Sequence, residues 1–227
     1  MTGLIALLLI VLATGLAAGA LPSAGFWWDL LAALGYCAFA LVAFMGWDSE
    51  SPAKNPRLKL HRNLAILGTT IAATHAVGYL VIDQTVIEYL LPSAPAYMLM
   101  GILAFILLLG MTVSSLPGPR RKSYSGFPAF RNWHRALFLL LLISTGWHVL
   151  GTDFSLYRVW QAVALGIMLG GAPVAAYWAR RTNLSLPMTP EPGSEAAADR
   201  HPILIGLLML LLSAAFAGIK VLTCDVC

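Results

Sequence analysis

Charged residues are scarce in this sequence. Lysine, arginine, aspartate and glutamate make up 11% of the 227 residues, whereas hydrophobic residues make up 59% and the mean hydropathy is +0.79. Soluble domains carry about 25% charged residues, so this chain has too little polar surface to face water on all sides. The formal net charge of +4 does not indicate a nucleic-acid binder, because the basic residues lie in short stretches between apolar runs.

Cysteine is also scarce, with three residues in the chain. Cys37 lies inside an apolar run and is expected to be a small buried side chain. Cys224 and Cys227 form a C-D-V-C segment, but no histidine follows, so the C-x-x-C-H pattern of haem attachment is absent. Three interpretations of this pair stay open: a redox disulfide, a pair of soft-metal ligands, and a tail without chemistry.

Long apolar runs fill most of the chain, and a helix needs about 20 such residues to cross a bilayer. The first run ends in small residues, as a signal peptide does, but it lacks a positively charged start, so we expect a retained helix. No strand alternation is visible, and the sequence predicts an all-α integral membrane protein. The seven runs are Leu4–Leu21, Phe26–Trp47, Leu60–Ile82, Ala96–Leu116, Trp133–Leu150, Tyr157–Trp178 and Pro202–Leu222.

A segment rich in proline and small residues divides the chain. Leu184–Arg200 reads L-S-L-P-M-T-P-E-P-G-S-E-A-A-A-D-R, which is typical of a flexible linker. We therefore expect a six-helix transmembrane domain at 1–181, a cytoplasmic linker at 182–201, and one extra transmembrane helix with a C-x-x-C tail at 202–227.

Basic residues are unevenly distributed among the loops. Lysine and arginine concentrate in cytoplasmic loops, and three alternate loops with their flanks hold most of them here. The pattern predicts a multi-pass protein of the bacterial inner membrane, with a cytoplasmic N-terminus and a periplasmic C-terminus. The basic residues concerned are Lys54, Arg57, Lys59 and Arg62; Arg120, Arg121, Lys122, Arg131 and Arg135; and Arg180, Arg181 and Arg200.

Four of the five histidines form two pairs with the same spacing. His61 and His75 lie fourteen residues apart in one predicted helix, and His134 and His148 lie fourteen apart in another. Fourteen helical residues rise about 21 Å and miss a whole number of turns by about 40°, so each pair shares one helix face. One antiparallel helix separates the two, so they run in the same direction, which places His61 level with His134 and His75 level with His148.

Two imidazoles at one depth can supply both axial ligands of a haem iron. We therefore predict two b-type haems, an inner one held by His61 and His134 and an outer one held by His75 and His148. Other interpretations are histidines hydrogen-bonded between helices, a zinc site, which needs three or four ligands, and a proton path in a transporter or assembly factor. Asp29 is the main acidic residue available for such a path.

Residues beside the histidines fit a bound macrocycle. Gly68 and Gly78 lie on the histidine face of their predicted helix, where small residues would let a large planar group approach. Arg62 and Arg135 directly follow the two inner histidines and are expected to pair with haem propionates.

Two stretches carry a family resemblance. H-R-N-L-A-I-L-G-T-T-I-A-A-T-H-A-V-G-Y at His61–Tyr79 and F-R-N-W-H-R-A-L-F-L-L-L-L-I-S-T-G-W-H-V-L-G at Phe130–Gly151 resemble the ferric reductase-like transmembrane domain superfamily. That superfamily includes NADPH oxidases, ferric reductases and the haem subunit of the bacterial periplasmic methionine sulfoxide reductase system. The resemblance covers roughly Leu4–Arg181. It implies a bundle of six helices with two stacked haems, which pass electrons from a cytoplasmic donor to ferric iron, oxygen, a periplasmic enzyme or a thiol outside.

One feature of the superfamily is missing from this sequence. The oxidases and eukaryotic reductases carry a C-terminal domain for FAD and NADPH, whereas no G-x-G-x-x-G follows a strand here. We expect the chain to be the haem subunit of a transmembrane oxidoreductase whose electrons come from a separate flavoprotein or from quinol. The nearest alternative is a quinol-linked cytochrome b subunit of a partner oxidoreductase.

Overall fold

The computed structural model describes residues 23–47, 56–116, 127–152, 159–160, 163 and 194–224. All regular structure in these residues is helical. Five of the helices are long and apolar enough to cross a membrane, and the short 3-10 helix η1 (Gln84–Leu90) joins two of them. The five are α2 (Phe26–Trp47), α3 (Pro56–Ile82), α4 (Ala96–Ser114), α6 (Phe127–Gly151) and α8 (Ser194–Cys224).

The spans predicted from the sequence agree with these helices. The apolar parts of α2, α3, α4, α6 and α8 begin and end within a few residues of five of the seven apolar runs. The run Leu4–Leu21 lies outside the described residues, and so does nearly all of Tyr157–Trp178. The all-helical membrane fold is confirmed, whereas the count of six helices in the core stays a prediction.

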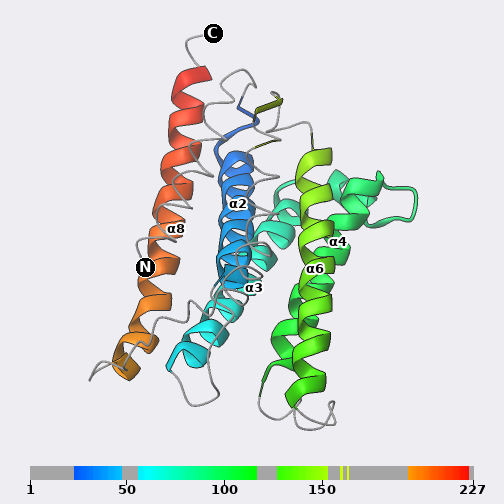
Figure 1. Ribbon diagram of the computed structural model, residues 1–227. Helices are drawn as coiled ribbons and strands as arrows, with labels where there is room; N and C mark the ends of the chain where they lie inside the picture. Colours follow the sequence, from blue (N-terminus) through cyan, green and yellow to red (C-terminus); the bar gives the residue numbers. More distant parts are fainter. Residues whose placement is uncertain are drawn as a thin grey trace.

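The helices alternate in direction along the chain. In Figure 1, α2 and α4 run downward, and α3, α6 and α8 run upward. The end at which α2 and α4 begin is called the upper end below, and the end at which α3 and α6 begin is called the lower end. Since α3 and α6 run in the same direction, their first residues lie toward the lower end and their last residues toward the upper end.

Helix α2 lies in the middle of the bundle and packs against α3 and α8, while α4 packs against α6. In α2, 72% of the span is buried, against 11% to 33% in the other four helices. Small side chains at Ala33, Cys37 and Ala40, each 0% exposed, let the neighbouring helices approach closely. The other helices expose apolar faces, which suit contact with lipid acyl chains.

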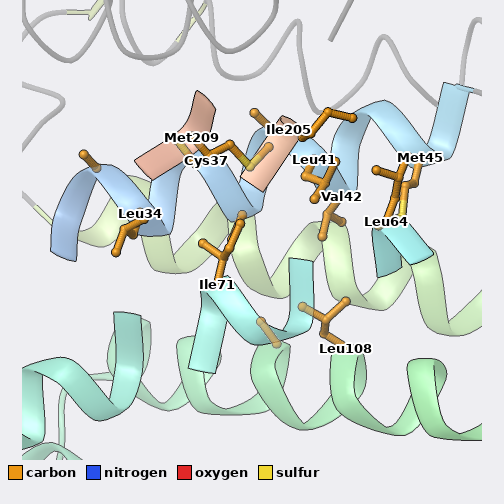
Figure 2. Packing of buried hydrophobic residues seen from close by; sticks show 14 of the residues in the cluster. Leu34, Cys37, Leu41, Val42, Met45, Leu64, Ile71, Leu108, Ile205 and Met209 are labelled. Carbon is orange, nitrogen blue, oxygen red and sulfur yellow. The ribbon is translucent and has the colours of Figure 1, made fainter. Parts of the chain in front are cut away.

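A hydrophobic cluster joins α2 to its neighbours (Figure 2). Leu41 on α2 and Met209 on α8 are both fully buried in it. Burying a side chain of this size contributes about 1.5–3 kcal/mol in water, but lipid is itself apolar, so close packing is the main gain here. The labelled members of the cluster are Leu34, Cys37, Leu41, Val42, Met45, Leu64, Ile71, Leu108, Ile205 and Met209.

Helix α8 begins earlier than the sequence predicts. Its span from Pro202 to Leu222 agrees with the predicted helix, but the helix itself starts at Ser194, inside the predicted linker 182–201. The segment E-A-A-A-D-R after Ser194 is rich in strong helix formers, which outweighs the proline in the helix interior. The rest of the linker lies outside the described residues.

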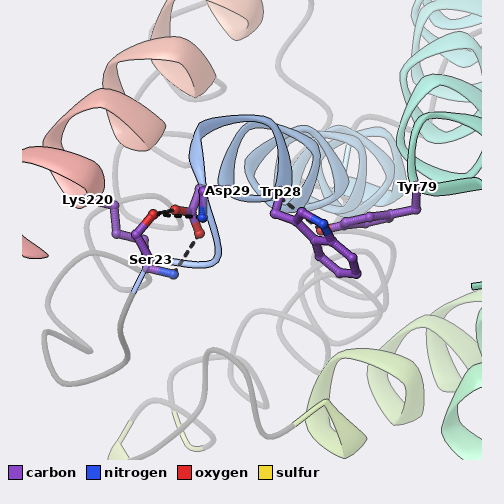
Figure 3. A network of polar contacts seen from close by, with 6 residues as sticks. Ser23, Trp28, Asp29, Tyr79 and Lys220 are labelled. Carbon is purple, nitrogen blue, oxygen red and sulfur yellow. Dashed lines mark hydrogen bonds and ion pairs between the residues drawn. The ribbon is translucent and has the colours of Figure 1, made fainter. Parts of the chain in front are cut away.

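An ion pair joins α8 to α2 at the upper end (Figure 3). Lys220 Nζ lies 2.9 Å from Asp29 Oδ1, and the Ser23 hydroxyl donates a hydrogen bond to Asp29 Oδ2. The side chain of Asp29 is 0% exposed and that of Lys220 is 15% exposed. A buried carboxylate needs such partners, so the last helix supplies the charge that α2 requires.

The segment between α3 and α4 starts with an aspartate cap. The backbone N–H and the hydroxyl of Thr85 both donate hydrogen bonds to Asp83 Oδ1, at 2.9 Å and 2.7 Å. These bonds favour the charged carboxylate and hold the pKa of Asp83 below its usual range. The cap fixes the start of η1 at the upper end of the bundle.

Candidate functional site

The two histidines predicted to form the inner pair face one another at the lower end. His61 projects from the first turns of α3 and His134 from the early part of α6. Their ring centroids lie 6.3 Å apart, with an angle of 62° between the ring planes. The Phe130 ring lies 5.2 Å from the His134 ring at 30°, and this contact restricts the orientation of that imidazole.

This separation can be compared with that of two imidazoles on one metal ion. With metal–nitrogen bonds of about 2 Å and a nitrogen lying about 1 Å from each ring centre, two imidazoles on opposite sides of an ion would have centroids about 6 Å apart. The observed 6.3 Å fits two axial ligands of a haem iron. In the described part of the chain, no three His, Cys, Asp or Glu side chains lie together as zinc would require.

The two histidines predicted to form the outer pair lie at the upper end. His75 Nδ1 lies 2.7 Å from the backbone oxygen of Leu31, and His148 Nδ1 lies 3.0 Å from the backbone oxygen of Tyr97. A carbonyl oxygen only accepts hydrogen bonds, so each Nδ1 carries the proton and each Nε2 keeps a lone pair for a metal.

Aromatic side chains enclose the His75 end of the site. The Tyr79 ring lies 5.1 Å from the His75 ring in an edge arrangement. Its hydroxyl donates a hydrogen bond to the backbone oxygen of Trp28, at 3.1 Å, and the two aromatic rings lie 4.6 Å apart (Figure 3). Tyr79 therefore connects the histidine face of α3 to the start of α2.

The glycines on the histidine face of α3 lie against leucine side chains of α2. A Cβ atom on Gly68 would lie 3.4 Å from Leu41 Cδ2, and one on Gly78 would lie 2.9 Å from Leu31 Cδ1. Gly78 therefore makes room for a leucine of α2, whereas the distance at Gly68 is an ordinary van der Waals contact. The prediction missed this because spacing in a sequence does not show which neighbouring helix covers a face.

The two predicted propionate partners lie at the lower end, each next to a histidine. Arg62 is half-buried on α3 and Arg135 is exposed on α6. Arginine binds carboxylates through paired N–H groups, so the two side chains could pair with acidic groups of a cofactor held by His61 and His134.

The cysteines divide between the core and the C-terminus. Cys37 is fully buried, and its Sγ lies 3.5 Å from Ser213 Oγ on α8, which confirms its predicted burial. Cys224 is the last residue of α8, but its side chain and Cys227 lie outside the described residues.

The acidic residue on which a proton path would depend is ion-paired. Asp29 contacts Lys220 and Ser23 at the junction of α2 and α8. Sequence reasoning did not find this partner, because 191 residues separate the two charges. Asp29 therefore joins α2 to α8 through an ion pair.

Comparison with known proteins identifies a family. A family model described as ferric reductase like transmembrane component matches residues 1–145. This segment is more than half of the chain and includes His61, His75 and His134, while His148 lies three residues beyond it. No curated protein and no solved structure is matched.

Proposed function

We propose, from the premise that this chain belongs to the family of ferric reductase-like transmembrane components, that it carries electrons across a membrane through two b-type haems. The observation that supports this most strongly is the pairing of His61 with His134, at a ring separation suited to two axial ligands. His75 and His148 form the second pair at the opposite end of α3 and α6.

The protein's contribution is ligation, spacing and control of potential rather than acid–base chemistry. When bound, each haem supplies an iron that takes up and releases one electron. The four histidines would hold the two groups about fourteen helical residues apart, or about 21 Å along the helix axis. The Arg62 and Arg135 guanidinium groups would neutralise propionates at the lower end.

The charge at the two ends supports the proposed orientation in the membrane. The lower end carries basic residues at the starts of α3 and α6, including Lys59 and Arg131, and the positive-inside rule assigns it to the cytoplasm. Electrons from a flavoprotein or quinol would enter at the lower pair, leave at the upper pair, and reach an acceptor outside. The C-terminus would then be periplasmic, which a C-terminal alkaline phosphatase fusion tests: an inactive fusion contradicts this orientation.

Haem content tests the proposal directly. The purified protein should show a b-type spectrum on reduction with dithionite and two haems per chain. His61→Ala and His75→Ala should each remove about one haem, and His201→Ala, which changes the histidine outside the pairs, should remove none. A purified protein without a haem band would refute the proposal, and loss of no haem in either paired variant would refute the ligand assignment.

The donor and the C-terminal cysteines need separate assays. Oxidation of a quinol by the purified protein in lipid vesicles would favour the cytochrome b alternative. Reduction of the haems only after a cytoplasmic flavoprotein fraction is added would favour a flavoprotein donor. The double variant Cys224→Ser with Cys227→Ser tests whether that pair passes electrons outward. Unchanged reduction of an external acceptor by this variant would exclude such a role.

A further inference from the structure

The two upper histidines contact their neighbouring helices in the same way. His75 on α3 faces the backbone oxygen of Leu31 on α2, at 2.7 Å. His148 on α6 faces the backbone oxygen of Tyr97 on α4, at 3.0 Å. In both cases a glycine follows the acceptor residue four positions later, as Gly35 in α2 and as the corresponding glycine in α4.

These glycines lie against the imidazole rings. A Cβ atom on Gly35 would lie 2.7 Å from both Nδ1 and Cε1 of His75. A Cβ atom on Gly101 would lie 2.7 Å from Nδ1 and 2.9 Å from Cε1 of His148. The Cα–Cβ bond of a helical residue tilts toward the helix N-terminus, so a side chain there would cover the carbonyl one turn earlier. Glycine leaves that carbonyl open to the ring.

The acceptor residues make a second contact that also occurs twice. The side chain of Leu31 packs on Gly78, which lies three residues after its histidine, and a Cβ there would be 2.9 Å from Leu31 Cδ1. The side chain of Tyr97 packs on Gly151, again three residues after its histidine, and a Cβ there would be 2.7 Å from Tyr97 Cγ. The same four-residue arrangement therefore joins α3 to α2 and α6 to α4.

We infer that Gly35 and Gly101 are positioning residues that orient His75 and His148 as ligands of the upper haem, an inference that rests on the proposed function. Each glycine lets the imidazole donate its Nδ1–H to a helix carbonyl, which presents Nε2 to the iron. This hydrogen bond makes the imidazole a stronger electron donor, which favours the oxidised iron and keeps the potential of the upper haem low.

Alanine substitutions test the two glycines. Gly35→Ala and Gly101→Ala should each raise the midpoint potential of one haem or remove that haem, and leave the other haem unchanged. Redox titration, haem counting and low-temperature EPR of the oxidised protein measure these effects. Gly110→Ala is the matched control on α4, because nothing lies within 4 Å of a Cβ at that position. Two haems with parental potentials and EPR signals in both test variants would overturn the inference.

A second experiment tests the hydrogen bond without crowding the helices. His75→Gly leaves space for an added ligand, and imidazole should restore the second haem because it can donate an N–H to the Leu31 carbonyl. The probe 1-methylimidazole has no N–H and should bind about ten-fold or more weakly, since outer hydrogen-bond partners contribute about 10–100-fold to metal affinity. Equal binding of the two probes would overturn the inference. A parental protein without haem would instead refute the proposed function.

Discussion

The ion pair between α2 and α8 makes a prediction with a definite size. Removing one partner of a buried ion pair costs about 3–5 kcal/mol, whereas an exposed pair contributes about 0–1 kcal/mol. The Asp29 carboxylate is 0% exposed and Lys220 is 15% exposed. Lys220→Met should therefore lower the free energy of unfolding by about 3 kcal/mol, because it leaves a fully buried carboxylate without the ammonium group that balances its charge.

The opposite substitution should cost less. Asp29→Asn keeps an oxygen that accepts from Ser23, and the flexible Lys220 side chain can turn its ammonium group toward water, so we expect a loss of about 1–2 kcal/mol. The double variant should be more stable than Lys220→Met alone, because no uncompensated charge stays buried.

Reversible unfolding in mixed detergent micelles, followed by tryptophan fluorescence, measures all three variants in a double-mutant cycle. The reasoning fails if Lys220→Met costs no more than Asp29→Asn. It also fails if the loss in the double variant equals the sum of the two single losses.

Three other contacts predict measurable effects. Gly46→Ala should destabilise the protein by about 1–3 kcal/mol through overpacking, because its Cβ would lie 2.8 Å from a phenyl carbon of α6; a thermal midpoint equal to that of the parent would contradict this. Ser213→Val and Ser213→Ala both remove the hydroxyl that lies 3.5 Å from the Cys37 thiol, so the two variants should change the rate at which Cys37 reacts with thiol reagents by the same factor. A large difference between the two rates would show that the hydroxyl is not what Ser213 contributes. The depressed pKa of Asp83 predicts that the cap is fully stabilising above the ordinary carboxyl pKa and weakens as pH falls through the lower folded value. The protection factor of the Thr85 amide, which compares its exchange rate with the intrinsic rate at the same pH, should therefore fall at acid pH, and Asp83→Asn should abolish that fall.

Features set by local geometry could be predicted from the sequence. The rise per residue of a helix and the thickness of a bilayer are constants, so the apolar runs located five spans closely. The same constants predicted that His61 would face His134 across two parallel helices, and the structure brings those rings within 6.3 Å. Both inferences needed only the spacing along one helix and the direction of its neighbours.

Features that depend on the choice of neighbouring helix could not be predicted. The packing of Gly68 and Gly78 on leucines, and the carbonyl acceptors of His75 and His148, depend on which helix covers which face. The duplicated arrangement leaves one signal in the sequence: a glycine three residues after each upper histidine. That signal gains a meaning only when the neighbouring helices are known.

The helix start at Ser194 shows a third kind of limit. The predicted linker has a proline-rich first half and an alanine-rich second half. Because its composition was averaged over the whole segment, the helix-forming second half was not recognised. Helix propensity over the shorter window favours the observed start.

The position of Lys220 has a consequence for the order of events during synthesis. Asp29 leaves the ribosome 191 residues before its partner, and at about 5–20 residues per second that interval lasts about 10–40 s. During this time the nascent α2 carries a carboxylate whose counter-charge does not yet exist. Helix α2, which occupies the centre of the bundle, is thus made early but reaches its final environment late. An arrested chain that lacks α8 should keep Asp29 accessible to water and to chaperones of the insertion machinery.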